Sequence, residues 1–191
     1  SMGADFIEPD VVLTKDKIPI VLHDIYLEET TDVEKKFLDS KRDDGHYYAI
    51  DFSLKEIKTL KVKERVNLQT NKSVFPSRFP QGLGSFSVPT LEELFELISG
   101  MNKSRKKEVG IYPEIKRPDF YRKNQYDSAK IIYDKIVSLK KRMPNVGVVI
   151  QCFESKILKR IREEFKDSEV VLNQLFPISD EGEFGFNKID K

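Results

Sequence analysis

The sequence predicts an α/β protein built from parallel βα units. Between residues 89 and 176, short apolar strands alternate with helices whose apolar residues recur at helical spacing. The chain has 191 residues, which is long enough for one large domain or two small ones with a real core. Glycine and proline occur nine times each, an ordinary content that excludes collagen-like and low-complexity chains.

The first two strands predict a hairpin. Segment 6–12, with the sequence FIEPDVV, is an apolar strand that carries Glu8 and Asp10 on one face, because side chains alternate along a strand. Pro9 lies between them, lacks an amide donor and marks an edge or an irregular position. A turn then leads into a second strand over residues 18–22.

Residues 24–88 follow a less regular pattern. The sequence from Ser53 to Glu56 has the form of a capping box and predicts a short helix. Residues 67–88 are rich in Asn, Ser, Gly, Pro and Phe without a clear period, which indicates a long excursion. A loop of this length inside a compact domain is usually functional.

From Pro89 onward the pattern is rhythmic. A second capping box at Thr90 predicts a helix that ends near Gly100. No glycine-rich phosphate loop follows a strand, which weakens the interpretation as a nucleotide-binding protein. The remaining predicted strands are 109–116, 146–153 and 170–176, and the remaining predicted helices are 128–141 and 154–165.

Composition excludes several classes of protein. Lys and Arg number 33 and Asp and Glu number 32, so a broadly basic face for nucleic acid is not expected. No apolar run reaches 18 residues, and no signal peptide opens the chain, so we expect no transmembrane segment and leave the compartment open. The single cysteine, Cys152, allows no internal disulfide and is predicted to be inert in a buried strand.

Three carboxylates come from two apolar strands. Glu8 and Asp10 lie in the first strand, and Glu114 lies in strand 109–116. A buried carboxylate is costly unless it is paired or bound to a metal, and an oxygen-rich set suits a hard cation such as Ca²⁺ or Mg²⁺. The alternative is that Glu8 and Asp10 face solvent on an edge strand.

Two further polar residues are candidates for catalysis. Lys116 shares a strand face with Glu114 and could stabilise an anionic oxygen such as a phosphate, or form a salt bridge to Glu114. His23 ends the second strand and could transfer protons near neutral pH. The alternative for His23 is a hydrogen-bonded histidine at the end of a strand.

An ordered set of motifs resembles the glycerophosphodiester phosphodiesterase family. Glu8-Pro-Asp10 followed by His23 matches the family's Glu-x-Asp and its second histidine. The match looks like the branch that includes the bacterial periplasmic enzymes, and it covers the chain up to about residue 176. The other matching segments are Tyr26 to Val33, Asp44 to Phe52, Arg78 to Pro80, Ile111 to Lys116, Gln151 to Phe153 and Asn173 to Leu175.

The resemblance implies a TIM-type (β/α)₈ barrel that is partial here. By analogy, residues 1–191 form a single partial barrel domain with about the second to fifth strands, and residues 24–88 are an insertion after the second strand. The His-Arg pair of the family's first strand is absent from this sequence. A barrel without half of its strands has open edges, through which we expect the chain could associate with itself.

The resemblance also implies an enzyme. Members of the family hydrolyse glycerophosphodiesters such as glycerophosphocholine, a small-molecule substrate, to glycerol 3-phosphate and an alcohol. They use a divalent cation, Ca²⁺ or Mg²⁺, whose ligands correspond to Glu8, Asp10 and Glu114. His23 corresponds to one of two acid–base histidines, and Lys116 to a residue near the phosphate. The family analogy implies a periplasmic or secreted location.

The missing His-Arg pair supports an alternative function of another class. In this alternative the chain is a catalytically inactive truncated module of the same fold, acting in metal binding or protein interaction. A phospholipase-like enzyme on the same barrel is a third interpretation, but the insertion matches the soluble diesterase branch more closely.

Overall fold

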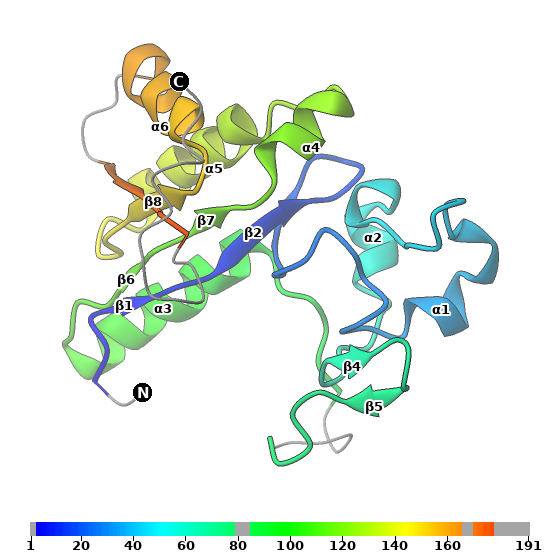
Figure 1. Cartoon of the computed structure of the whole chain (residues 1–191). Helices are drawn as coiled ribbons and strands as arrows, with labels where there is room; N and C mark the ends of the chain where they lie inside the picture. Colours follow the sequence, from blue (N-terminus) through cyan, green and yellow to red (C-terminus); the bar gives the residue numbers. More distant parts are fainter. Residues whose placement is uncertain (1–2, 79–84, 166–169, 178–191) are drawn as a thin grey trace. The chain divides into compact units, whose positions relative to one another are not determined.

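In the computed structural model, shown in Figure 1, the chain folds into two compact units. The first unit comprises Ser1–Val11 and Glu92–Lys191, and the second comprises Val12–Leu91. The structure describes residues 3–78, 85–165 and 170–177, and all statements below concern these residues.

The first unit is built around a parallel sheet. Within it the strand order is β2 (Asp10–Leu13, of which the first half belongs here), β7 (Glu114–Ile115), β8 (Val149–Cys152) and β9 (Val171–Gln174). Two shorter strands, β1 (Phe6–Ile7) and β6 (Gly110–Ile111), pair in parallel just before β2 and β7. The parallel sheet confirms the predicted α/β class.

The two pairs of strands form one continuous ladder. The amides of Gly110, Tyr112, Glu114 and Lys116 donate in turn to the carbonyls of Asp5, Ile7, Pro9 and Val11. The predicted strands 6–12 and 109–116 therefore correspond to real runs of pairing. Each contains a proline at the same register, where the missing amide interrupts the pattern of regular strands.

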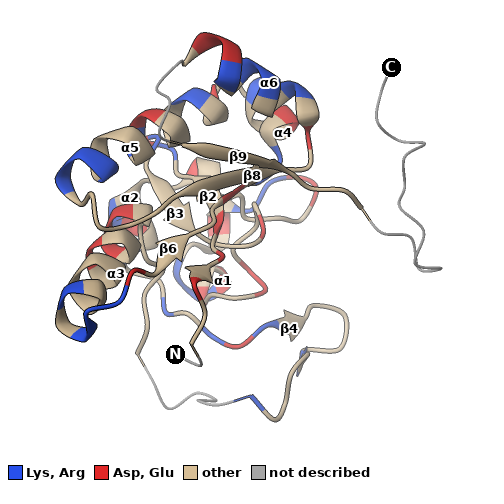
Figure 2. Cartoon of the chain, turned by 90° about the vertical axis from the view of Figure 1, so that its left-hand side faces the viewer, with Lys and Arg blue, Asp and Glu red and all other residues tan. Residues whose placement is uncertain are grey.

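Helices of the first unit cover this sheet. α5 (Ser128–Arg142) packs on β7, and α6 (Ser155–Glu164) packs on β8 and β9. Basic residues occupy the last turns of α3 (Leu91–Arg105) and α5, as the blue helix ends in Figure 2 show. Their positive charges interact favourably with the negative end of the helix dipole. The core of this unit includes Phe95, Ile115, Ile132, Ile136, Leu139, Ile150, Leu158 and Ile161.

The prediction that the helix after residue 90 ends near Gly100 is wrong. Helix α3 continues to Arg105, and Gly100 is exposed in its interior. Asn102, in the last turn of the helix, binds the segment that follows it. Its side chain exchanges two hydrogen bonds of 2.9 Å with the backbone of Val109. A Cβ at Gly100 would meet no atom within 4 Å outside the helix's own backbone, so this face of the helix is open.

The second unit begins with the hairpin that the sequence predicts. After β2, the amide of Thr14 donates to the carbonyl of Ile18 at 3.1 Å, and β3 (Pro19–Val21) follows. Lys17 takes a positive φ of 62° in the turn. The capping box at Ser53 is confirmed, since Ser53 and Glu56 hydrogen-bond reciprocally at the start of α2 (Leu54–Ile57).

Several elements were not predicted. In the second unit they are α1 (Val33–Lys36), the 3₁₀ turns η1 (Leu38–Ser40) and η2 (Ala49–Asp51), and the antiparallel hairpin of β4 (Val66–Asn67) and β5 (Lys72–Ser73). In the first unit the short helix α4 (Pro118–Lys123) is added. Hairpin β4–β5 occupies part of the predicted excursion 67–88, of which residues 79–84 lie outside the described residues.

Candidate active site

Three carboxylates lie together where β2 and β7 run side by side. One oxygen each of Glu8, Asp10 and Glu114 lies within 4.8 Å of the others. Asp10 is paired directly with Glu114 in the parallel register, and Glu8 projects from the same face two residues earlier. Glu8 is exposed, Asp10 is half-buried and Glu114 is buried, so the group, here named the carboxylate cluster, opens to solvent on one side.

Lys116 lies among these carboxylates. Its Nζ is 3.0 Å from Oδ1 of Asp10 and 3.0 Å from Oε1 of Glu114, and the side chain is only 14% exposed. Burial alone would lower the pKa of Lys116, but the hydrogen bonds to the two carboxylates outweigh it and leave the pKa raised. The ammonium therefore stays charged at neutral pH and pairs with both neighbours, not with Glu114 alone.

Gln151 on β8 reaches the carboxylate cluster through a gap that Pro9 leaves in the sheet. In the parallel pattern the amide of residue 9 would face the carbonyl of Tyr112, but a proline has no amide hydrogen. That carbonyl accepts the side-chain amide of Gln151 instead, at 3.3 Å. The same Nε2 donates to Oε1 of Glu8 at 2.9 Å, which ties Glu8 to the strand.

Partial burial and the neighbouring charges of the cluster together raise the pKa of Glu8. Burial has the largest effect, and the neighbouring charges of Asp10 and Glu114 add to it. Lys116 and the hydrogen bond from Gln151 lower the pKa of Glu8 but only partly compensate. An additional positive charge nearby would therefore favour the ionised form of Glu8.

The donor set fits a divalent cation. Three carboxylates and one ammonium leave two uncompensated negative charges when all four groups are ionised. All the available donors are hard oxygens from two strands, which is the chemistry that Mg²⁺ and Ca²⁺ prefer. The structure therefore brings together the three carboxylates that the sequence analysis singled out, and their role as ligands stays a prediction.

Tyr112 and Asn173 extend this polar region, and of the two only Asn173 is a polar amide within a predicted apolar strand, 170–176. Nδ2 of Asn173 donates to the hydroxyl of Tyr112, whose ring packs edge-on against Phe6 at a centroid distance of 6.3 Å. Tyr112 was missed because a tyrosine in an apolar strand carries no signal that separates a site residue from a core residue.

His23 lies in the second unit, two residues after β3. Its Nδ1 is 2.7 Å from Oδ1 of Asp24, and the side chain is 60% exposed. Among the described residues, no hydrogen bond engages the second ring nitrogen, Nε2. His23 is therefore a hydrogen-bonded histidine at the end of a strand with one nitrogen free for proton exchange.

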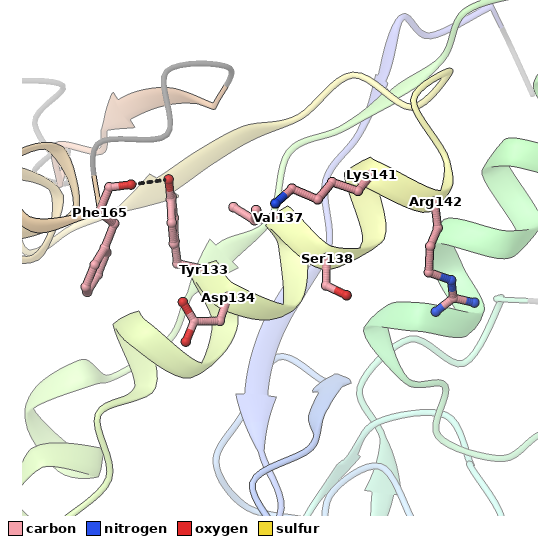
Figure 3. A pocket seen from close by; sticks show the side chains of 7 residues that line it. All are labelled: Tyr133, Asp134, Val137, Ser138, Lys141, Arg142 and Phe165. Carbon is pink, nitrogen blue, oxygen red and sulfur yellow. Dashed lines mark hydrogen bonds between the residues drawn. The ribbon is translucent and has the colours of Figure 1, made fainter.

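A cavity of about 560 Å³ in the first unit is separate from these residues (Figure 3). It lies on α5 and near the end of α6, and none of its lining residues belongs to the carboxylate cluster. Figure 3 shows the hydroxyl of Tyr133 donating to the carbonyl of Phe165 at its margin, at 2.8 Å. The lining residues are Tyr133, Asp134, Val137, Ser138, Lys141, Arg142 and Phe165.

Cys152 is buried and its thiol is held neutral. Burial raises the pKa of Cys152 to about 12, which agrees with the prediction of an inert thiol. In the part of the chain that the structure describes, no helix is both long and apolar enough to span a membrane.

Sequence comparison connects this arrangement to known proteins. The sequence model of the Glycerophosphoryl diester phosphodiesterase family matches residues 1–180. A glycerophosphodiester phosphodiesterase of Haemophilus influenzae is 41% identical over 171 residues, which cover 84% of this chain and 45% of that protein. The corresponding protein of Treponema pallidum is 33% identical over 166 residues, or 86% of this chain and 47% of its own length.

The fold agrees with solved structures of the same kind. A putative glycerophosphoryl diester phosphodiesterase of Silicibacter pomeroyi matches with a TM-score of 0.65 at 22% identity, covering 100% of this chain and 60% of that one. A phosphodiesterase of Oleispira antarctica, solved with the product sn-glycerol-3-phosphate, matches with a TM-score of 0.57 at 19% identity, over 93% and 57% of the two chains.

These likenesses extend the fold assignment beyond the α/β class. At this level of identity the structural matches speak for the fold, a TIM-type barrel that is partial here. The chain spans about half the length of the curated relatives that it matches. Since the family's sequence model covers nearly the whole chain, the chain belongs to the glycerophosphoryl diester phosphodiesterase family.

Proposed function

We propose that this chain carries the cation site and one acid–base residue of an enzyme that hydrolyses glycerophosphodiesters. The products would be glycerol 3-phosphate and an alcohol, and glycerophosphocholine is the substrate that we would test first. The observation that carries the proposal is the carboxylate cluster with Lys116 in a chain of this family.

In this proposal Glu8, Asp10 and Glu114 hold a divalent cation, Ca²⁺ or Mg²⁺. When bound, such a cation supplies charge neutralisation for a phosphate and lowers the pKa of a hydroxyl that it contacts. Lys116 already carries a stable positive charge beside these carboxylates, so it is placed to attract a phosphate oxygen.

His23 is proposed to act as general acid or general base. Its Nδ1 is engaged by Asp24, which leaves Nε2 to exchange a proton with an alcohol oxygen. We favour the role of acid, in which the imidazolium protonates the leaving alcoholate. A second acid–base group, which the family takes from a His-Arg pair, is expected outside this sequence.

The remaining parts of the proposal concern the architecture. Residues 24–88 are proposed to be an insertion after the second strand of the barrel, within a partial barrel domain over residues 1–191. Among the described residues β9 is the last strand of the sheet order, and we propose that the chain can associate with itself through this edge.

Release of glycerol 3-phosphate from glycerophosphocholine by the full-length protein tests this function. We expect turnover that disappears with a chelator and returns with Ca²⁺ or Mg²⁺, and the better of the two identifies the preferred cation. Glu114→Gln should lower kcat about 100-fold or more and weaken cation binding in calorimetry.

Glu92→Gln is the matched control. Glu92 is an acidic residue of the same unit, paired with Lys135 and Arg142 and not part of the carboxylate cluster, so activity should stay near the wild-type value. Cation binding without turnover by the wild-type protein, or full activity of Glu114→Gln, would contradict the proposed function.

A further inference from the structure

Asp24, which contacts His23, is itself held by Arg65. Oδ1 of Asp24 lies 2.7 Å from Nδ1 of His23, and Oδ2 lies 2.5 Å from Nη2 of Arg65. The other terminal nitrogen of Arg65, Nη1, donates to Oε2 of Glu29. One guanidinium therefore bridges two carboxylates, and each oxygen of Asp24 has its own partner.

The backbone around Arg65 is fixed by the segment that carries Glu29. The amide of Val66 donates to the carbonyl of Glu29 at 3.0 Å, and the amide of Lys63 donates to the carbonyl of Thr30 at 2.8 Å. The carbonyl of Arg65 accepts from Val74 at 2.8 Å. The backbone is thus paired at Arg65 itself and at Glu29, one of its two carboxylate partners, which restrains the planar fork.

The same contacts keep Asp24 ionised. Burial would raise the pKa of Asp24, but the hydrogen bonds from His23 and Arg65, with the positive charge of Arg65, outweigh it and lower the pKa. An ionised carboxylate only accepts hydrogen bonds, so Nδ1 of His23 must be the nitrogen that bears a proton. The free nitrogen, Nε2, then carries the second proton only in the imidazolium form.

We propose that Arg65 is a positioning residue for His23, which it orients through Asp24. This inference rests on the proposed function for its effect on catalysis, though not for its effect on the histidine itself. Without Arg65, the carboxylate of Asp24 is free to rotate and to present either oxygen to His23, since both torsions of its side chain lose their restraint. The ring then samples other orientations and the other tautomer.

Arg65→Ala in the full-length protein is the first experiment. We expect kcat for glycerophosphocholine to fall about 10- to 100-fold, because misplacement of an acid–base group costs rate and not binding, with KM within about twofold. The limb of the pH–rate profile that belongs to His23 should shift, and added guanidinium should restore part of kcat. Arg65→Lys keeps the charge but lacks the fork that spans Asp24 and Glu29, so its kcat should lie between those of the wild type and Arg65→Ala.

Arg42→Ala is the matched control. Arg42 makes a two-point ion pair with Asp51 in the same unit, at 2.6 and 2.7 Å, with a similar exposure of 35% against 27% for Arg65. Its loss should lower stability to a similar degree without changing kcat or the pH–rate profile. Equal losses of kcat in Arg42→Ala and Arg65→Ala would show a structural role only and overturn the inference.

A measurement independent of activity separates this inference from the proposed function. Nitrogen-15 NMR of the His23 ring should show Nδ1 protonated in the wild-type protein, and a mixture of tautomers in Arg65→Ala and, more weakly, in Glu29→Gln. An unchanged His23 spectrum in Arg65→Ala would overturn the inference even if the wild type is active. A wild type without diesterase activity would overturn the proposed function, while the spectra would still decide whether Arg65 orients His23.

Discussion

At the residue scale, Lys116 is the group on which the carboxylate cluster depends. It is the positive charge that the structure places between Asp10 and Glu114, and it is largely buried. A buried carboxylate that loses its partner retains the full cost of its desolvation. The lysine therefore acts on folding as well as on a bound phosphate.

Lys116→Met tests this double role. The variant keeps the apolar stem and removes the charge, so we expect the free energy of unfolding to fall by about 2 kcal/mol, since the site is only partly closed to solvent. Urea denaturation at pH 7 measures the loss, and a divalent cation at saturating concentration should recover part of it. Lys130→Met is the control, because Lys130 pairs with Asp134 at an exposed position and should cost less than about 0.5 kcal/mol.

The proximity of the three carboxylates follows from the sequence because period-two spacing and parallel strand pairing are regular. Glu8 and Asp10 share a face by spacing, and strand order then brings Glu114 beside them. Arg65 could not be predicted in the same way. It contacts Asp24 across 41 positions of irregular chain, where no period relates the two residues.

At the element scale, the ends of helices carry specific energetic signals. Asp127 begins α5 by accepting the amide of Lys130 at 3.1 Å, and it also binds Arg160 of α6 through both oxygens, at 2.9 and 2.6 Å. One carboxylate thus caps one helix and ties it to the next.

Asp127→Ala should lower the free energy of unfolding by about 1 kcal/mol at pH 7, mainly through the lost cap. The hydrogen bond from Arg160 lowers the pKa of Asp127 below its ordinary value of 3.8, although burial opposes it. A carboxyl whose folded-state pKa is lowered contributes its full stabilisation above its ordinary pKa of 3.8, and this stabilisation is lost as the pH falls through the folded-state pKa. Urea denaturation should therefore show a difference between wild type and variant at pH 7 that shrinks toward pH 2.

Asp134→Ala provides the comparison for Asp127. Asp134 lies on the exposed surface of the same helix, and its loss should change stability by less than about 0.5 kcal/mol at any pH. A pH-independent difference between the wild type and Asp127→Ala would show that the charge of Asp127 has no role.

Two glycines of the first unit should respond in opposite directions to alanine. Gly100 lies in the interior of α3, where an added Cβ would meet no atom within 4 Å beyond the helix's own backbone, so Gly100→Ala should raise the free energy of unfolding by about 0.5–1 kcal/mol. At Gly110 a Cβ would lie 2.5 Å from the ring of Phe6 and 2.8 Å from the carbonyl of Gly147. Gly110→Ala should therefore cost about 2 kcal/mol, and thermal denaturation of both variants checks the signs.

Elements with a local signal were predicted, and those set by their surroundings were not. The capping box at Ser53 needs only four residues to be recognised, and the apolar period of α5 is repeated over several turns. Helix α4, in contrast, has Arg117 as its N-cap residue with a positive φ of 45°, a conformation that neither arginine nor the following proline favours. The positive φ of Arg117 is imposed by the surrounding fold.

At the scale of the whole molecule, the sheet of the first unit ends at β9 in the described part of the chain. Val171 at the start of β9 is 60% exposed, and the strand pairs with β8 on one side. A strand at the end of a parallel sheet, here with an exposed valine, can pair with another strand. The assignment to a partial barrel agrees with a sheet that ends at β9 within the described residues.

Val171→Lys tests the proposed self-association. A lysine on the edge disfavours pairing, so we expect the dissociation constant of any dimer to rise at least about 10-fold in sedimentation velocity. Leu97→Lys is the control, because Leu97 is 58% exposed but lies on α3, and it should leave association unchanged. A wild-type chain that stays monomeric at the highest concentrations measured would refute self-association.

Pro9 has a consequence for how the sheet can tolerate substitution. An ordinary residue at this position would bring an amide to the carbonyl of Tyr112, and the side chain of Gln151 would then compete with the main chain for the same acceptor. Displacing the side chain of Gln151 would also weaken its hydrogen bond to Glu8, because the same Nε2 donates to both acceptors. Pro9 thus keeps the carbonyl of Tyr112 available to the side chain of Gln151. Replacing Pro9 would alter the surroundings of Glu8 without changing any of the three carboxylates.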